Sequence, residues 1–228
     1  MLDAEITIVV ALFPQLTQLD FTGPAQVFAR MSNTRVVLAA RTLDPVMTDC
    51  GWAIVPTSTF DTAPLADVLF VPGGAGAFDA MLDSEVLDFI RRQAGAAAFV
   101  SSVCTGSFVL GAAGLLRGKR ATSHWASLHM LVELGAIPTS ERVVSDGAVI
   151  TGAGVSSGID FALLLAERLR GQEAAQRIQL TIEYDPEPPF TTGSAKNAPA
   201  DWVSAGRRDA EEARLEPIRQ AARALSPL

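Results

Sequence analysis

The apolar residues of this chain alternate between short continuous runs and stripes at helical spacing. Four runs rich in β-branched residues predict buried strands at 5–12, 35–40, 66–71 and 99–103. Stripes at helical spacing predict helices at 23–28, 84–93, 126–134, 159–169 and from 173 to about 183. A short strand at 118–122 and two hairpins, at 46–59 and 141–151, complete the pattern. This alternation predicts an α/β fold, an open doubly wound sandwich with a mostly parallel central sheet.

The pattern changes at Asp185, because three prolines within 186–189 end the last helix of the α/β region. A stretch of Gly, Ser, Asn and Pro follows, and then an Arg- and Glu-rich helix is predicted over 205–224. We therefore divide the chain into an α/β domain, residues 1–184, and a C-terminal arm with a terminal helix, residues 185–228.

The arm carries apolar residues that a free tail should not expose. They include Phe190, Trp202 and Val203, and the predicted terminal helix has an apolar stripe suited to packing. We expect the arm to pack on the α/β domain or across a partner subunit. The alternative is a frayed tail, because chain ends are commonly disordered.

The stretch 99–116 changes period at Cys104. A strand-like run ends at Val103, and a helix of small residues punctuated by Phe108 and leucines follows. A residue at such a sharp turn is displaced from the carboxyl end of the sheet and lies by a helix N-terminus, where backbone N–H groups favour a thiolate. The sequence therefore predicts that Cys104 is a nucleophile on an elbow, with a lowered thiol pKa. The alternative is that Cys104 is a small buried apolar residue.

Composition narrows the classes of function. The chain has 228 residues, of which 49% are hydrophobic, enough to bury a full core. Its net charge of −7 opposes binding to a phosphate backbone, so we expect no nucleic-acid partner. The N-terminus is acidic and no apolar run approaches the ~18 residues of a membrane span, so we expect a soluble cytoplasmic protein without membrane contact. In that compartment Cys50 and Cys104 should both be free thiols.

Three further features have open interpretations. Asp20 lies just before the helix predicted from residue 23, where it is either a helix cap or, if Cys104 is nearby, a catalytic acid. The glycine loop 72–77 lacks the spacing of a phosphate-binding loop, but its backbone can aim an N–H at an oxyanion or let two elements approach closely. Cys50 falls at a hairpin turn without a neighbouring base, so we assign it no chemistry.

Three segments carry a family resemblance when they are taken in order. They are Asp20-Phe-Thr-Gly-Pro24, Ser102-Val-Cys-Thr-Gly106 and Gly154-Val-Ser-Ser-Gly-Ile-Asp160. With the Pro72-Gly-Gly74 loop they resemble the ThiJ/PfpI superfamily, relatives of the class I glutamine amidotransferases, over roughly residues 5–183. Within that superfamily the three segments are similar to the isocyanide hydratases. The resemblance implies a flavodoxin-like sandwich, usually a homodimer, with the cysteine beside a carboxylic acid.

The resemblance also implies roles for individual residues. Cys104 would be the nucleophile, Asp20 the acid and base, and Thr105 a further residue of the site. The N–H groups of Gly74 and Thr105 would line an oxyanion pocket, and three further pocket residues are implied, Gly73, His124 and Val155. His124 has the simpler alternative of a hydrogen-bonded wall imidazole. No metal or organic cofactor is implied.

The implied reaction is the hydration of a small-molecule isocyanide to an N-substituted formamide through a cysteine thioimidate. The peptidases that this superfamily resemblance includes have His directly after the cysteine. Thr105 stands at that position here, so the resemblance does not extend to a Cys-His dyad. Two alternatives remain. One is a glyoxalase or deglycase acting on reactive carbonyls with the same thiol and acid. The other is a ligand-sensing module like that of AraC-type regulators, here without a DNA-binding region.

Overall fold

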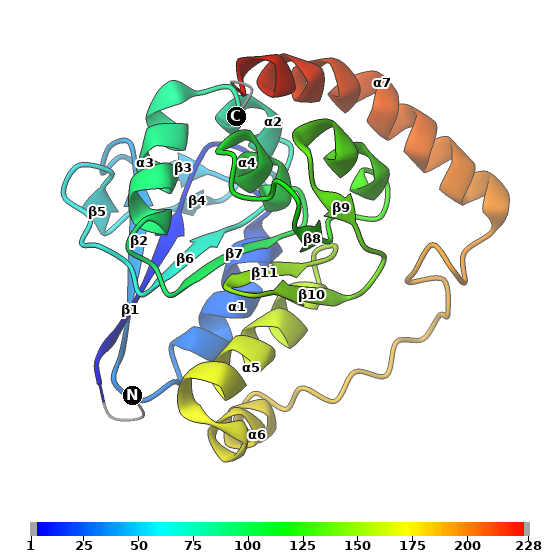
Figure 1. The fold of residues 1–228 in the computed structure, drawn as a ribbon. Helices are drawn as coiled ribbons and strands as arrows, with labels where there is room; N and C mark the ends of the chain where they lie inside the picture. The colour runs from blue at the N-terminus through cyan, green and yellow to red at the C-terminus, as the bar shows by residue number, and fades with distance from the viewer. Residues whose placement is uncertain (1–3, 226–228) are drawn as a thin grey trace.

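The computed structural model describes residues 4–225, and a seven-stranded sheet runs through its centre (Figure 1). The strand order is β10-β11-β7-β6-β1-β2-β5. Every neighbouring pair is parallel except β10 and β11, which form a hairpin. The predicted mostly parallel, doubly wound sheet is therefore confirmed. The strands of this sheet are β1 (Ile6–Ala11), β2 (Thr34–Ala40), β5 (Ser58–Thr59), β6 (Val68–Val71), β7 (Phe99–Val103), β10 (Val143–Asp146) and β11 (Val149–Gly152).

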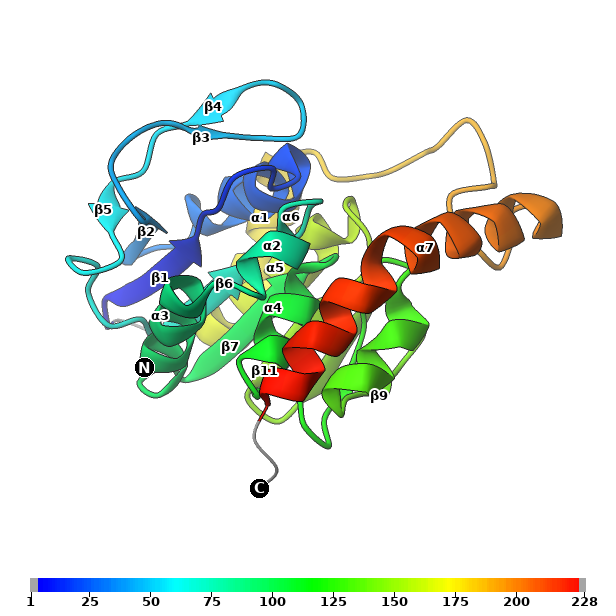
Figure 2. The same ribbon diagram turned by 90° about the horizontal axis from the view of Figure 1, so that it is seen from above.

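Helices cover both faces of the sheet, and the core lies between the layers (Figures 1 and 2). One face carries α1 (Gln18–Phe28), α5 (Ser157–Arg170) and α6 (Gln172–Thr181); the other carries α2 (Ala77–Ala80), α3 (Ser84–Ala94), α4 (Gly106–Ala112) and the 3-10 helix η1 (Leu128–Leu134). Phe28, Phe70 and Phe161 form an aromatic cluster between α1, α5 and the sheet, with ring centroids 5.5 to 6.3 Å apart. Such edge-to-face and offset contacts add to the burial of apolar area.

Several predicted boundaries need correction. The hairpin predicted over 46–59 is shorter, with β3 (Val46–Met47) paired to β4 (Ala53–Ile54), because residues 58–59 instead join the sheet edge as β5. The short strand predicted at 118–122 is β8 (Arg120–Ala121), which pairs in parallel with β9 (Ile137–Pro138). The helix predicted up to residue 134 is the 3-10 helix η1.

Helix α1 begins at Gln18, five residues before the predicted start at residue 23. Pro24 favours a helix start in the sequence, but it lies inside α1 and packs against the backbone of α5, where a Cβ on Gly158 would be 3.0 Å from the proline ring. Tertiary contact therefore outweighs the local preference of proline for the first turn. As a consequence, Asp20 lies within the first turn of α1 and not ahead of it.

The arm ends in α7 (Ala200–Ala224), which begins five residues before the predicted start at 205. Figure 2 shows α7 crossing the molecule beside α4 and η1. Ile218 of α7 is fully buried, while the exposed fractions of Phe190 and Trp202 are 76% and 62% in this single chain. None of the helices within residues 4–225 combines the length and the apolar character needed to span a bilayer.

Candidate active site

The candidate site lies where the carboxyl ends of four neighbouring parallel strands, β11, β7, β6 and β1, meet. The segments that leave these strands carry Val155, Cys104, Gly73 and Asp20, respectively. Open α/β sheets place their sites at this edge because the loops there converge. The fold thus brings together residues that are up to 135 positions apart in sequence, 155 minus 20.

Cys104 occupies a strained turn between β7 and α4. Its φ angle is +56°, in the left-handed region that a residue with a Cβ adopts only at a cost of roughly 1–2 kcal/mol. Its N–H donates to the carbonyls of Gly152 (3.1 Å) and Ala153 (2.8 Å), which hold the strained conformation in place. A Cβ at Gly106 would be 2.3 Å from the Val71 carbonyl oxygen, so the elbow also requires a glycine two residues after the cysteine. The predicted elbow is therefore present in the structure.

Asp20 is fully buried and faces the Cys104 side chain. Its Oδ2 accepts the N–H of Gly73 at 3.0 Å, and its side chain interacts with the Cys104 thiol. It does not cap α1, because the N–H of Gln18 donates to Asp49 Oδ1 (3.1 Å) on the neighbouring hairpin. Asp20 is therefore not the N-cap of α1, although it lies in the first turn of this helix, and its carboxyl group lies beside the Cys104 thiol.

Burial dominates the electrostatics of this pair. It raises the pKa of Asp20 to about 7, against the opposing hydrogen bonds from Cys104 and Gly73. A carboxyl group with this pKa can take up and release a proton near neutral pH. The prediction for Cys104 was wrong, because the thiol pKa is raised, first by burial and then by the negative charge of Asp20. Helix α4 has only seven residues, so its N-terminus offsets little of this cost.

Thr105 connects the elbow to the glycine loop. Its Oγ1 accepts the N–H of Gly74 (2.8 Å) and donates to the Gly74 carbonyl (2.9 Å). The Gly74 N–H is therefore engaged by the Thr105 hydroxyl in this structure. Its role in an oxyanion pocket stays a prediction. The Thr105 N–H, in contrast, interacts with the Cys104 thiol. A Cβ at Gly73 would be 2.5 Å from Thr105 N and 2.8 Å from Cys104 Cβ, so only glycine fits between them.

Val155 and His124 both lie at the segment that follows β11. The N–H of Val155 also interacts with the Cys104 thiol, which places this residue in the site. A Cβ at the preceding Gly154 would lie 3.0 Å from His124 Cδ2, so the imidazole packs on this segment. His124 accepts the Ala126 N–H at its Nδ1 (3.4 Å), and burial and the charge of Arg214 lower the pKa of its ring. A neutral wall imidazole fits these contacts.

Sequence reasoning did not identify three residues that support the site. The Oγ atoms of Ser107 and Ser123 both donate to the Cys104 carbonyl, at 3.1 and 2.9 Å. Arg214 of α7 donates to Ser127 Oγ (2.6 Å), and its guanidinium carbon lies 5.3 Å from the centre of the Phe78 ring. Ser107 and Ser123 are close to Cys104 and His124 in sequence, but nothing in the pattern shows which buried serines face a carbonyl. Arg214 could only be found from the docking of the arm.

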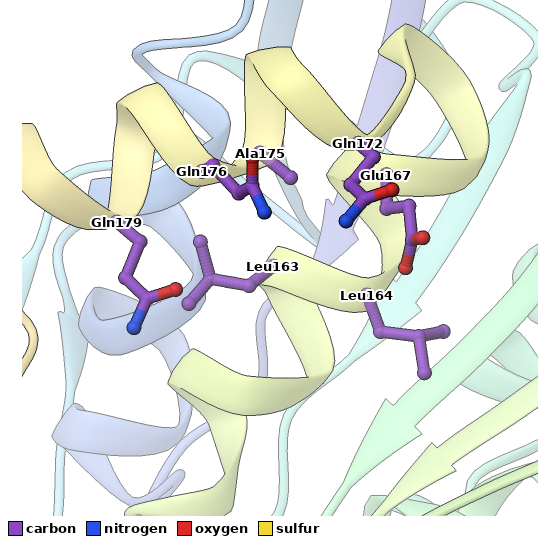
Figure 3. Close-up of a pocket in the computed structure, with 7 residues that line it drawn as sticks. All are labelled: Leu163, Leu164, Glu167, Gln172, Ala175, Gln176 and Gln179. Atoms are coloured by element: carbon purple, nitrogen blue, oxygen red, sulfur yellow. The ribbon is translucent and has the colours of Figure 1, made fainter.

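Two surface cavities lie apart from the Cys104–Asp20 pair. Figure 3 shows the first, of about 290 Å³, between α5 and α6 and lined by Leu163, Leu164, Glu167, Gln172, Ala175, Gln176 and Gln179. The second, of about 340 Å³, lies between Trp125 and the arm residues around Trp202. Neither cavity is lined by Cys104 or Asp20. Within residues 4–225, no cluster of three or more His, Cys, Asp or Glu side chains could hold a metal ion.

Fold and site define an α/β protein with a cysteine on a strand-to-helix elbow beside a buried carboxylic acid. The model of the DJ-1/PfpI family matches residues 6–168, and the chain belongs to this family. A Pseudomonas putida protein described as isonitrile hydratase is 53% identical over 199 residues, which cover 87% of each sequence.

Solved structures agree with this assignment. The crystal structure of a ThiJ/PfpI family protein from Pseudomonas syringae matches with a TM-score of 0.91 at 44% identity, and the match covers 96% of this chain and 90% of that one. The crystal structure of Drosophila melanogaster DJ-1beta matches with a TM-score of 0.71 at 27% identity, over 78% of this chain and 98% of that one.

Proposed function

We propose that the protein is an isocyanide hydratase, which adds water to an isocyanide, also called an isonitrile, to give an N-substituted formamide. The observation that carries the proposal is the buried pair of Asp20 and Cys104. The thiol is a nucleophile for the electrophilic terminal carbon, and the pKa of about 7 lets Asp20 accept and return a proton near neutrality. The 53% identity to the Pseudomonas putida isonitrile hydratase supports the same reaction.

The first half of the reaction forms a carbon–sulfur bond. Because the thiol pKa is raised, Cys104 is protonated at rest, and the Asp20 carboxylate removes its proton as the sulfur attacks the terminal carbon of the isocyanide. The carbon lone pair that results takes this proton back from Asp20. The product is a thioimidate, R–N=CH–S–Cys104, and Asp20 is again a carboxylate. One proton, shared between two buried groups, completes this half.

The second half returns the thiol. The Asp20 carboxylate removes a proton from water as the oxygen attacks the thioimidate carbon, and it then protonates the nitrogen. The tetrahedral adduct, R–NH–CH(OH)–S–Cys104, expels the sulfur as the carbonyl forms, and the hydroxyl proton passes through Asp20 to Cys104. The formamide R–NH–CHO leaves. The N–H groups of Thr105 and Val155, which interact with the thiol, stabilise negative charge on the sulfur in both halves.

Two substitutions test the proposal, with formamide production from an alkyl or aryl isocyanide as the assay. Cys104→Ala should abolish turnover because the nucleophile is lost. Asp20→Asn keeps the shape of the side chain but cannot exchange the proton, so turnover should fall at least about 100-fold while the fold is retained by circular dichroism. Cys50→Ser, at the exposed cysteine, is the control and should keep wild-type turnover. Wild-type rates in Cys104→Ala would disprove the assignment.

Methylglyoxal consumption, measured beside isocyanide hydration, tests the glyoxalase alternative. Both reactions would need the same thiol and acid, so the two variants alone cannot separate them. Thr105 after the cysteine and Asp at position 20 favour the hydratase in the sequence. A higher kcat/KM for methylglyoxal than for every isocyanide tested would reverse the proposal.

The protein is further proposed to act as a homodimer in the cytoplasm. The exposed Phe190 and Trp202 support an assembly, because a single chain leaves these apolar side chains uncovered. Light scattering of the full chain should give the mass of two copies.

A further inference from the structure

The carbonyl of Cys104 accepts two hydroxyl groups, and this arrangement has a consequence for the nucleophile. Ser107 Oγ donates at 3.1 Å and Ser123 Oγ at 2.9 Å, and both serines are buried, with exposed fractions of 0% and 1%. Ser107 lies in the first turn of α4, where a hydroxyl bonds a carbonyl three residues earlier by local geometry. Ser123 is 19 residues downstream and reaches the carbonyl from the loop after β8. It therefore needs its own support.

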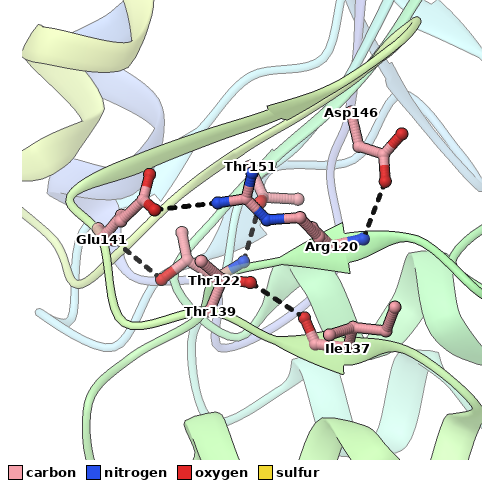
Figure 4. Close-up of polar contacts among 7 residues, drawn as sticks. All are labelled: Arg120, Thr122, Ile137, Thr139, Glu141, Asp146 and Thr151. Carbon is pink, nitrogen blue, oxygen red and sulfur yellow. Dashed lines mark hydrogen bonds and ion pairs between the residues drawn. The ribbon is translucent and has the colours of Figure 1, made fainter.

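That support comes from β8, as Figure 4 shows. The N–H of Thr122 donates to Thr151 Oγ1 on β11 (2.9 Å). The Oγ1 of Thr122 donates to the Glu141 carbonyl (2.9 Å). Thr122 is buried and adjoins Ser123. The backbone N–H of Arg120 adds a further anchor on Asp146 Oδ2 (2.9 Å). The backbone that leads to Ser123 is thus anchored at Arg120, in β8, and at Thr122, directly after it.

The planarity of the peptide bond links these hydroxyls to the reactive sulfur. In a trans peptide the C=O of Cys104 and the N–H of Thr105 point in opposite directions, so fixing one fixes the other. The Thr105 N–H interacts with the Cys104 thiol. We propose that Ser123, together with Ser107, is a positioning residue that holds the Thr105 N–H toward the sulfur of Cys104. Without the hydroxyls, the peptide plane between Cys104 and Thr105 loses these two anchors on its carbonyl, and the N–H is held less firmly toward the sulfur.

The proposal rests on Cys104 being the nucleophile of the proposed function, but its test does not need the isocyanide. In a Cys50→Ser background, where Cys104 is the remaining thiol, the second-order rate of alkylation by iodoacetamide reports how readily the thiolate forms. Ser123→Ala should slow alkylation at pH 8 by about five- to tenfold, because one hydrogen bond to a charged sulfur is weakened. Ser107→Ala should slow it less, and Ser123→Thr, which keeps a hydroxyl, should restore the rate.

Ser101→Ala is the matched control. Ser101 is also fully buried, in β7, and its Oγ donates to a backbone carbonyl, that of Leu69, at 2.8 Å. Removing it should lower the thermal midpoint about as much as Ser123→Ala does but leave the alkylation rate unchanged. Equal alkylation rates in Ser101→Ala and Ser123→Ala would overturn the proposal, because the hydroxyls would then only satisfy a buried carbonyl. If Ser123→Ala does not fold, the same comparison is made with Ser107→Ala. If all the serine variants lose isocyanide turnover but keep the wild-type alkylation rate, the positioning role is wrong. The proposed function is not affected by that outcome.

Discussion

At the scale of single residues, burial explains the chemistry better than proximity to a helix does. Cys104 was expected to have a lowered thiol pKa from its place before a helix, yet its exposed fraction is 5% and its neighbour is a carboxyl group. Taking both groups out of water makes each harder to ionise, and the ionisation of one opposes that of the other. Asp20 and Cys104 therefore share a proton at rest, whereas the sequence predicts a free thiolate.

This shared proton predicts how stability depends on pH. The pKa of Asp20 is about 7 in the folded chain, against an ordinary value of 3.8 that applies once the chain unfolds, so below pH 3.8 both states hold the proton and burial has no ionic cost. Between these values the unfolded chain releases the proton first, and the free energy of unfolding falls by roughly 4 kcal/mol in total as pH rises to 7. Asp20→Asn should not show this fall.

Urea unfolding at pH 4, 5.5, 7 and 8 measures the effect. As the pH rises across this range, Asp20→Asn should become more stable relative to the wild-type chain. Asp79→Asn, at an exposed carboxyl on α2, is the control and should keep the wild-type dependence. A constant difference between Asp20→Asn and wild type would show that the folded chain does not hold this proton.

At the scale of elements, the sequence predicts those whose signals are local. Helix α3 has an amphipathic stripe and a capping aspartate, Asp83, whose Oδ1 accepts the Glu85 N–H at 3.0 Å, and its predicted span of 84–93 differs from the structure by one residue. The buried strands followed from their apolar runs for the same reason. Helix α1 was predicted five residues short, because Asp49 of a distant hairpin caps its first turn and Pro24 packs against α5. Local sequence carries neither contact.

In the candidate site, too, local features could be predicted from the sequence and tertiary contacts could not. The turn at Cys104 could be predicted because the apolar period changes there. The role of Asp20 came only from the family resemblance, because its position alone left a helix cap open. The actual partner of the Gly74 N–H, Thr105 Oγ1, and the two serines on the Cys104 carbonyl depend on how loops from three strands meet. Such contacts are set by tertiary packing and leave no periodic signal.

Gly73 tests how tightly these elements fit. A Cβ there would lie 2.5 Å from Thr105 N and 2.8 Å from both Asp20 Oδ2 and Cys104 Cβ. Gly73→Ala should therefore separate the acid from the thiol and lower kcat for isocyanide hydration by at least about tenfold, since displacements of about 1 Å have effects of this size. Gly95→Ala is the matched control: its φ is −65° and a Cβ there makes ordinary contacts, at 3.5 Å. A wild-type kcat in Gly73→Ala would show that the glycine loop 72–77 can shift to accept a methyl group without disturbing the site.

At the scale of the whole molecule, the C-terminal arm is connected to the site through the segment that bears His124. Helix α7 holds this segment at successive turns. A Cβ at Gly206 would be 2.6 Å from the Trp125 ring, Arg214 bonds Ser127, and Glu211 lies 2.7 Å from His129 Nε2. The exposed ion pair on His129 contributes little by itself. The close fit on Trp125 and the bond to buried Ser127 are the contacts that hold the segment next to His124.

A point substitution separates the polar contacts of Arg214 from the packing of its side chain. Arg214→Met keeps an apolar stem for Phe78 but loses the bond to Ser127 and the charge near His124. The His124 ring pKa should therefore rise, which its NMR titration measures, and kcat should fall severalfold. Arg208→Met, at an exposed arginine of the same helix, is the control.

Removal of the arm after Tyr184 then tests the larger claim. Ile218 of α7 is fully buried, and emptying such a site costs about 2–5 kcal/mol even for a single side chain. The thermal midpoint of the truncated chain should therefore fall by several degrees. Turnover should fall with it, because the segment from His124 to Ser127 loses its support. Light scattering on the same sample shows whether the arm also joins two copies. If mass, thermal midpoint and turnover all match those of the full chain, then α7 supports neither the fold nor the site, and the contacts to Trp125 and Ser127 have no functional consequence.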